Sequence, residues 1–311
     1  MHKRERPPRQ AADWMAILQQ ALNEPGVANR AYHLFHRFSL GNSLWAALQI
    51  EGRGLPLGPI ASFKKWQDLG RQVRKGEKGI SLLMPVIVGG KKKRKDAQAA
   101  TEAPAAWLVG GGSEPTKSDA ESQAGRRIFV ERAHWFTLAQ TDPIEGVEPN
   151  PAAQAEPDAI EFVPDRAIEK LGFRRERFHN TDGNKMGYSY PGEGVLAVSD
   201  LATDPTKTLI HEMAHCLLHT DSEAIVEGRT LPRAIIEVEA ECVAYLVCAT
   251  IGHMASAAHM REYIQSWLSL SGEGSDVFTK KNASRVFSAA NKIIQAGTEL
   301  DEVEEMQRAA A

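Results

Sequence analysis

Residues 208–219 are TLIHEMAHCLLH, and they contain the motif H-E-x-x-H at His211, Glu212 and His215. Residues four apart in an α-helix lie on one face, so both imidazoles can reach the same ion. Glu212 is offset to one side of that face, where it could act as a general base on a water molecule. Apolar neighbours and an upstream Asp204-Pro205 favour a helix. The stretch therefore predicts a metal-binding helix with two histidine ligands and one catalytic glutamate.

A catalytic zinc site needs a third protein ligand and leaves one coordination position open. Three glutamates follow in one apolar segment, Glu237, Glu239 and Glu241. Glu241 comes 26 positions after His215, which allows a turn and a return helix, and its small apolar neighbours predict burial. A buried carboxylate needs a partner. We therefore rank Glu241 first as the third ligand, then Glu237, then Glu239, with Zn²⁺ as the expected cofactor.

Other residues near the motif have predicted roles. His219 lies two turns, about 12 Å, beyond His211, so we interpret it as a residue of the helix end or of the surroundings of the ligands. Tyr245 and Tyr190 are alternatives for stabilising an oxyanion, and neither is favoured. Residues 195–199 directly precede the motif helix and are expected to line the substrate cleft.

The composition is typical of a soluble protein. The chain has 311 residues and contains no apolar run near 18 residues, which excludes an ordinary transmembrane helix. Its N-terminus, MHKRERPPRQ, is charged and rich in proline, unlike a secretory signal. The three cysteines, at positions 216, 242 and 248, lie in apolar surroundings and predict reduced core thiols. We expect a cytoplasmic protein that does not associate with membranes.

The two ends of the chain have opposite net charges. Residues 1–95 contain 18 Lys and Arg against 6 Asp and Glu, a net charge of +12. Residues 96–311 contain 19 against 34, a net charge of −15. Such asymmetry indicates a part that faces nucleic acid joined to a part with another task. We therefore expect two domains, at residues 1–142 and 158–311, joined by a Pro- and Ala-rich linker at 143–157.

The apolar periodicity predicts an α+β protein. The first domain has helices near 13–22, 32–50 and 62–69, a turn at 70–79, and strands at 80–88 and 127–138. We expect these strands to pair around a low-complexity insertion, residues 91–125, that is too polar to form a core. The second domain is mainly helical, with a small sheet from residues 188–190 and 195–198. Its helices are expected at 164–171, 206–219, 234–248, 259–270 and 283–296.

The basic domain interleaves Lys and Arg with aromatic residues, as single-stranded nucleic acid binders do. Alternatives are that the tryptophans belong to the core, that the turn at 70–79 is an ordinary solvated loop, and that the basic patch binds a protein. The side chains that we predict to contact single-stranded DNA are Arg37, Asn42, Lys64, Lys65, Trp66, Arg71, Arg74, Lys75 and Lys78.

Several of these residues also carry a family resemblance. The segments RFS at 37–39, SF at 62–63, VRKGEKG at 73–79 and QTD at 140–142 resemble the N-terminal domain of ArdC-type antirestriction proteins. The motif helix and the segment around Glu237 and Glu241 are similar to the zincin-like metallopeptidase domain found with it. The resemblance covers most of residues 11–270. The insertion at 91–125 and the last helix depart from the pattern.

This resemblance implies a sequence-independent single-stranded DNA-binding domain joined to a metallopeptidase-like domain. It also implies carriage on a mobile element and protection of incoming DNA from host restriction. Two alternatives stay open at this point. The chain could be a zinc protease that cleaves a DNA-associated, restriction or regulatory protein, or a non-catalytic DNA-binding protein with a structural zinc.

Overall fold

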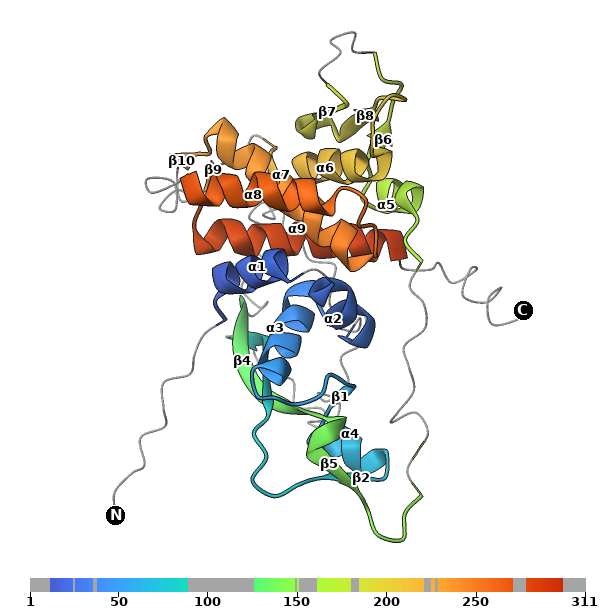
Figure 1. Cartoon of the computed structure of the whole chain (residues 1–311), viewed down its shortest axis with the longest axis vertical. Coiled ribbons are helices and arrows are strands. Elements are labelled where there is room, and N and C mark those ends of the chain that lie inside the picture. Colours follow the sequence, from blue (N-terminus) through green and yellow to red (C-terminus); the bar gives the residue numbers. More distant parts are fainter. Residues whose placement is uncertain are drawn as a thin grey trace, which may run out of the picture. The chain divides into compact units, whose positions relative to one another are not determined.

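The computed structural model describes residues 12–24, 26–35, 38–88, 126–148, 150, 161–179, 185–220, 225–226, 229–270 and 278–298. The fold is a mixed α+β arrangement, as predicted (Figure 1). Contacts divide the chain into two compact units. The first unit comprises Met1–Asp13 and Arg37–Glu156, and the second comprises Trp14–His36 and Pro157–Ala311. Among the described residues, no helix is long and apolar enough to cross a bilayer.

The first unit is built on a three-stranded antiparallel sheet of order β1-β4-β3. The predicted pairing of the two long strands is confirmed: β3 (Ile80–Val88) pairs with β4 (Arg126–Thr137), with an irregularity at Ile80/Ser81. A two-stranded ladder of β2 and β5 completes the unit. The remaining elements are α3 (Leu40–Glu51), β1 (Ile60–Ser62), α4 (Phe63–Asp68), β2 (Arg71–Val73), the 3-10 turn η3 (Leu138–Gln140) and β5 (Thr141–Pro143).

Helix α3 is joined to β3 by two side-chain amides. Asn42 both donates to the carbonyl of Leu83 (3.0 Å) and accepts from its backbone N–H (2.9 Å). Gln49, two turns further along the helix, makes the same pair of bonds with Ser81, at 2.8 and 2.9 Å. Each amide group therefore satisfies one donor and one acceptor of the β3 backbone.

The second unit is centred on α7 (Arg233–Thr250), which is buried almost throughout from Val238 onwards. Helices α6, α8, α9 and α2 pack against it or against each other. A sheet of order β6-β8-β7 contacts α6. The elements are α1 (Trp14–Asn23), α2 (Val27–Phe35), α5 (Pro164–Lys170), β6 (Arg174–Arg175), β7 (Gly187–Tyr190), η5 (Pro191–Glu193), β8 (Val195–Val198), α6 (Pro205–Leu218), β9 (Ile225–Val226), β10 (Arg229–Thr230), α8 (Ala257–Leu270) and α9 (Lys280–Thr298).

Helices α1 and α2 belong to this second unit, although they lie near the start of the chain. Figure 1 shows α1, in blue, beside α9, in red, and the rings of Trp14 and Phe287 lie 5.4 Å apart. The side chain of Asn29 on α2 donates to the carbonyl of Thr250 on α7 at 2.7 Å. The expected division at residue 142 placed these helices with the first domain, and the contacts place them with the second. Residues more than 200 positions later therefore pack against these two helices.

Candidate metal site and candidate nucleic-acid surface

Helix α6 carries the H-E-x-x-H motif, as predicted. It begins at Pro205, whose fixed φ suits the first helical position. The side chain of Asp204 accepts a hydrogen bond from the backbone N–H of Lys207 at 3.0 Å and caps the helix. The same carboxylate accepts from His253 (2.8 Å) and Ser256 (2.6 Å). Asp204 therefore fixes the start of the motif helix against the turn that follows α7.

Three side-chain atoms converge beside α6. Nε2 of His211 lies 3.1 Å from Nε2 of His215. Oε2 of Glu237, on α7, lies 3.6 Å from the first nitrogen and 3.7 Å from the second. Ligand atoms around a tetrahedral zinc ion, with bonds of about 2.0–2.2 Å, lie roughly 3.3–3.6 Å apart. Two imidazoles and one carboxylate so placed could hold a divalent metal ion.

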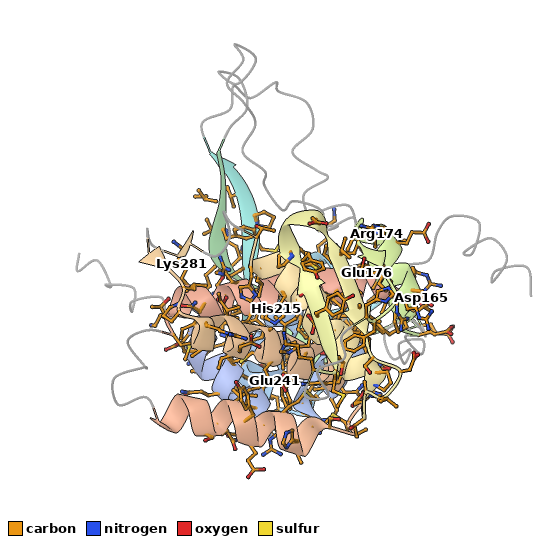
Figure 2. All side chains as sticks on the ribbon, turned by 90° about the horizontal axis from the view of Figure 1, so that it is seen from above. Asp165, Arg174, Glu176, His215, Glu241 and Lys281 are labelled. Carbon is orange, nitrogen blue, oxygen red and sulfur yellow. The ribbon has the colours of Figure 1, made fainter. Side chains whose placement is uncertain are left out.

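The structure corrects our ranking of the third ligand. Figure 2 labels Glu241 on α7 together with His215 on α6. Oε2 of Glu241 lies 3.0 Å from Nδ1 of His211, the nitrogen that faces away from the ligand group, but the ring N–H is not aligned for a hydrogen bond. The same oxygen lies 2.8 Å from Nζ of Lys207. The second choice, Glu237, occupies the position that we assigned to Glu241, because the earlier turn of α7 lies opposite the motif.

Charges around the two histidines are strongly coupled. Burial lowers the pKa of His211, but the carboxylates of Glu237 and Glu241 outweigh it and raise that pKa to about 9. Bonds from His211 and His215 hold the pKa of Glu237 well below its usual value. Burial raises the pKa of Glu241, and its contacts with His211 and Lys207 lower it below the usual value overall. The carboxylates of Glu237 and Glu241 therefore favour a positive charge at His211.

The predicted general base, Glu212, is buried and held from the neighbouring strand. Ser189 on β7 donates its hydroxyl hydrogen to Oε2 of Glu212 at 2.7 Å. A Cβ atom on Gly187 would lie 2.7 Å from Oε1 of Glu212 and 2.8 Å from Thr208. The β7 backbone therefore approaches Glu212 as closely as only glycine allows. Our sequence analysis missed both residues, although an isolated glycine in a strand is a signal of close approach.

His219 and Glu239 lie behind the ligand group. Nδ1 of His219 is 2.9 Å from Nδ1 of His215, and Nε2 of His219 is 3.0 Å from Oε2 of Glu239. Glu239, our third choice of ligand, is fully buried on the far side of His219 and does not face the candidate ion. Burial lowers the pKa of His219, against the opposing effect of the Glu239 carboxylate. The interpretation of His219 as part of the surroundings of the ligands agrees with this placement.

Two further expectations require correction. Tyr245 is fully buried and donates its phenolic hydrogen to the carbonyl of Ala21, so it does not face the site. Strand β8 lies between β6, which pairs with Val195 and Leu196, and β7, which pairs with all of residues 195–198, so β8 is not an edge strand of this sheet. Tyr190, at the end of β7, is half-exposed. The three cysteines are buried free thiols, as predicted.

Three residues of the predicted DNA surface have structural partners instead. Trp66 is 1% exposed and donates its indole N–H to the carbonyl of Phe136 at 2.8 Å, so its ring is not free for stacking. The guanidinium of Arg71 is buried against Thr141, with bonds of 2.7 and 3.0 Å. Asn42 bonds to β3, as described above. Helical apolar spacing already gave the core as an alternative for Trp66, but the bonds of Arg71 and Asn42 depend on strands distant in sequence.

Of the other candidates, Arg74, Lys75 and Lys78 lie in the turn at 70–79, and Lys64 and Lys65 lie on α4. Arg74 is ion-paired with Glu77 (2.9 Å) and Asp142 (3.3 Å). Arg37 lies outside the described residues. Four lysines are exposed, namely Lys64, Lys65, Lys75 and Lys78.

The turn that carries two of these lysines is fixed by side chains from two other segments. Arg53 donates to the carbonyl of Lys78 at 2.8 Å. Gln140 donates to the same carbonyl and to Glu77, both at 2.9 Å. The backbone of the turn is thus held in place, while its ammonium groups stay in solvent. We name Lys64, Lys65, Lys75 and Lys78 the four-lysine surface.

Comparison with known families identifies the N-terminal part of the chain. Residues 12–136 match the family model of the N-terminal domain of anti-restriction factor ArdC. We call residues 12–136 the ArdC-type domain after this match. The ArdC-type domain contains the four-lysine surface and ends before α6, so the candidate metal site lies outside it. It also includes α1 and α2, which pack with the metal-site helices.

Relatives of the whole chain are distant. An uncharacterized protein of Bacillus anthracis is 26% identical over 271 residues, which cover 80% of this chain and 44% of that protein. The chain therefore spans less than half the length of this relative. Crystal structures of the antirestriction ArdC protein from R388 plasmid align over 91% of this chain and 97% of that one (metal-free; 15% identity, TM-score 0.43) and over 93% and 99% (Mn(II)-bound; 16% identity, TM-score 0.47).

Proposed function

We propose that this protein is an ArdC-type antirestriction protein that binds single-stranded DNA and carries a zinc peptidase-like site. The observation that carries the proposal for the site is the convergence of His211, His215 and Glu237, with Glu212 held alongside. The ArdC-type domain supports the antirestriction role. Protection of incoming DNA from host restriction, and carriage on a mobile element, follow from that family relationship as parts of the proposal.

The proposed metal ligands are Nε2 of His211, Nε2 of His215 and Oε2 of Glu237. This donor set of two histidines and one glutamate suits zinc and leaves a fourth position open. A bound zinc ion would polarise a scissile carbonyl and make water more acidic. Glu212 would take the proton from this water. Ser189 holds Oε2 of Glu212 in place, and Oε1 lies beside Gly187 of β7.

The position of strand β7 favours a peptide as the substrate. In the sheet order β6-β8-β7 it is an edge strand, and it is the strand that contacts Glu212. An extended peptide could pair with such an edge through backbone hydrogen bonds alone. We propose β7, in place of the β8 residues expected from sequence, as the strand that aligns the substrate.

The four-lysine surface supports DNA binding without sequence preference. Ammonium groups contact phosphates, which carry no base information. Neighbouring Phe63 is 45% exposed and offers a ring on which a base could stack. With Trp66 and Arg71 buried, these residues are the contacts that we propose within the described part of the ArdC-type domain.

A protease that cleaves a host restriction or regulatory protein is the second candidate function. The contacts around Glu212 favour it over a structural zinc, because a purely structural site needs no general base in a fixed position. Both candidates share the same site and differ in whether DNA protection requires hydrolysis.

One experiment in a restricting host separates these functions. Survival of unmodified plasmid DNA is measured with wild type, with Glu212→Gln, and with a variant carrying Gln at all four lysines. The matched control carries Gln at Arg174, Arg175, Lys280 and Lys281, four exposed cations of the second unit. We expect protection by wild type and by the control, and loss with the four-lysine variant.

Each outcome assigns the function. Absence of protection by wild type would reject the antirestriction role. Full protection by Glu212→Gln would show that protection needs no hydrolysis. Zinc content and cleavage of denatured casein by the purified proteins then test the site itself. One zinc ion per chain in wild type and its loss in Glu237→Ala are expected.

A further inference from the structure

We propose that His219 is a positioning residue that fixes the tautomer and orientation of His215 through a direct bond between their imidazoles. Glu239 and two side chains of α9 would hold His219 in turn. This inference deepens the proposed metal site and rests on it. The observation behind it is a continuous series of contacts from His215 to α9, all within 3.2 Å.

The direction of each hydrogen bond in this series is determined by the first one. A metal ion bound to Nε2 of His215 would leave the proton of the neutral ring on Nδ1. That N–H can donate only to an acceptor, and the atom 2.9 Å away is Nδ1 of His219. The proton of His219 must then lie on Nε2, which is 3.0 Å from Oε2 of Glu239. A carboxylate accepts such a bond, so the series is consistent from end to end.

Glu239 is held from the other side by α9. Its Oε1 accepts from Nδ2 of Asn282 at 2.9 Å and from Nε of Arg285 at 3.2 Å. Glu239 is 0% exposed, and a buried carboxylate is tolerated when it is paired and hydrogen-bonded, as here. Arg285 also donates to the carbonyl of Leu218, next to His219, at 2.7 Å. The end of α6, the middle of α7 and the start of α9 are thereby joined at one point.

The two proposed histidine ligands are therefore supported in different ways. His211 has a carboxylate, Glu241, directly beside its Nδ1, and Lys207 fixes that carboxylate. His215 has a second imidazole in that place, and the carboxylate comes one residue further away. Partners that orient a histidine ligand typically contribute 10- to 100-fold to metal affinity. We assign the same contribution to His219.

Zinc affinity of the full-length protein, measured by competition with a chromophoric chelator, tests the proposal. We expect His219→Ala to weaken zinc binding by about 10- to 100-fold. His219→Asn keeps an acceptor oxygen near the position of Nδ1 and should lose less. Arg285→Ala should weaken binding, whereas Lys281→Ala, which removes the same charge from an exposed position on α9 (Figure 2), should leave it unchanged.

A second measurement needs no metal. The ¹⁵N chemical shifts of the imidazoles in the metal-free wild type report which nitrogen carries the proton. We expect the Nε2–H tautomer for His219. This readout decides the proposal even where His219→Ala fails to fold.

The outcomes distinguish this inference from the metal site on which it rests. Unchanged zinc affinity in a folded His219→Ala protein, or an Nδ1–H tautomer of His219, would overturn the positioning role and leave the site intact. A wild type that binds no zinc would overturn both. Equal losses for Arg285→Ala and Lys281→Ala would show a general charge effect and would remove α9 from the arrangement.

Discussion

Tyr245 on α7 donates its phenolic hydrogen to the carbonyl of Ala21 on α1, 3.1 Å away and 224 positions earlier in the chain. Both groups are buried. The bond gives Tyr245 a structural task and removes it from the residues that could contact a substrate. It also makes α1 part of the unit that contains the candidate metal site.

Replacement of Tyr245 by Phe should therefore reduce the stability of the protein and leave casein cleavage unchanged. The change leaves the carbonyl of Ala21 without this donor, and we expect the free energy of unfolding to fall by about 1–2 kcal/mol. Denaturant titration measures this loss. Tyr190→Phe, at an exposed position, serves as the control and should cost almost nothing. A loss of casein cleavage in Tyr245→Phe without a loss of stability would contradict this role.

The carboxyl group of Asp204 should make the stability of the folded protein depend on pH in the acidic range. Burial raises the pKa of its carboxyl, but bonds from Ser256, Lys207 and His253 outweigh burial and lower it below the usual value. A lowered folded-state pKa means that the stabilisation is complete above the unfolded pKa of about 3.9 and disappears as pH falls through the folded value. Asp204→Asn should thus show a smaller loss of stability on acidification below about pH 4 than wild type.

The magnitude of the Asp204 effect is that of a helix cap. Asp204→Ala removes the cap bond to the N–H of Lys207, which alone should cost about 1 kcal/mol at neutral pH, and also the bonds from His253 and Ser256, which add to that loss. Thermal unfolding at several pH values provides the measurement. Parallel acid profiles of wild type and Asp204→Asn would show that other carboxyl groups are responsible.

Gly187→Ala should impair turnover more than metal binding. Its new methyl group would lie 2.7 Å from Oε1 of Glu212, so the carboxylate must move. If Glu212 is the general base, we expect casein cleavage to fall by about 10²-fold, as for loss of the base itself. Zinc content should stay near that of wild type, because the atoms nearest the new methyl group belong to Glu212 and Thr208, which are not proposed ligands. Gly192→Ala, where a Cβ atom meets nothing within 4 Å, is the matched control.

The four-lysine surface should determine how DNA binding responds to salt. Removing one lysine–phosphate interaction reduces the slope of log affinity against log salt by roughly 0.7 for single strands. The variant with Gln at Lys64, Lys65, Lys75 and Lys78 should therefore flatten the slope by up to roughly 3. Fluorescence titrations with an unstructured oligonucleotide at several salt concentrations measure it. An unchanged slope would place the phosphate-binding residues elsewhere.

Trp66→Ala tests whether this ring is a core residue or a stacking platform. Because the ring is buried and bonded to Phe136, we expect a loss of about 3–5 kcal/mol of stability. Phe63→Ala, next to the lysines and half-exposed, should weaken DNA binding with little effect on stability. The reverse pattern would restore the stacking role that the sequence suggested for Trp66.

Local patterns predicted the motif helix, the pairing of β3 with β4 and the fold class, because each follows from apolar periodicity or from the order of the elements along the chain. The choice between Glu237 and Glu241 lay beyond these patterns. Both residues share one face of α7, and only the packing of α7 on α6 decides which turn lies opposite the histidines. The same holds for Arg71, whose burial depends on Thr141, 70 residues away.

The place of α1 and α2 could not be predicted either. Their apolar stripes indicate helices that need a partner, but they do not say which one. Contacts with α7 and α9 join segments more than 200 residues apart, and no local signal marks such distances. The charge asymmetry favoured a domain boundary near residue 142, because net charge carries no information about these contacts.

The paired amides of Asn42 and Gln49 have a consequence for self-association. They occupy the outward-facing donors and acceptors of Ser81 and Leu83 on β3, which is an outer strand of its sheet. Backbone N–H and C=O groups without partners on such a strand can pair with a strand of a second molecule, and this pairing commonly leads to aggregation. Helix α3 therefore covers this edge of the sheet. We expect the Asn42→Ala protein to form oligomers. Size-exclusion chromatography at a salt concentration too high for DNA binding would detect them.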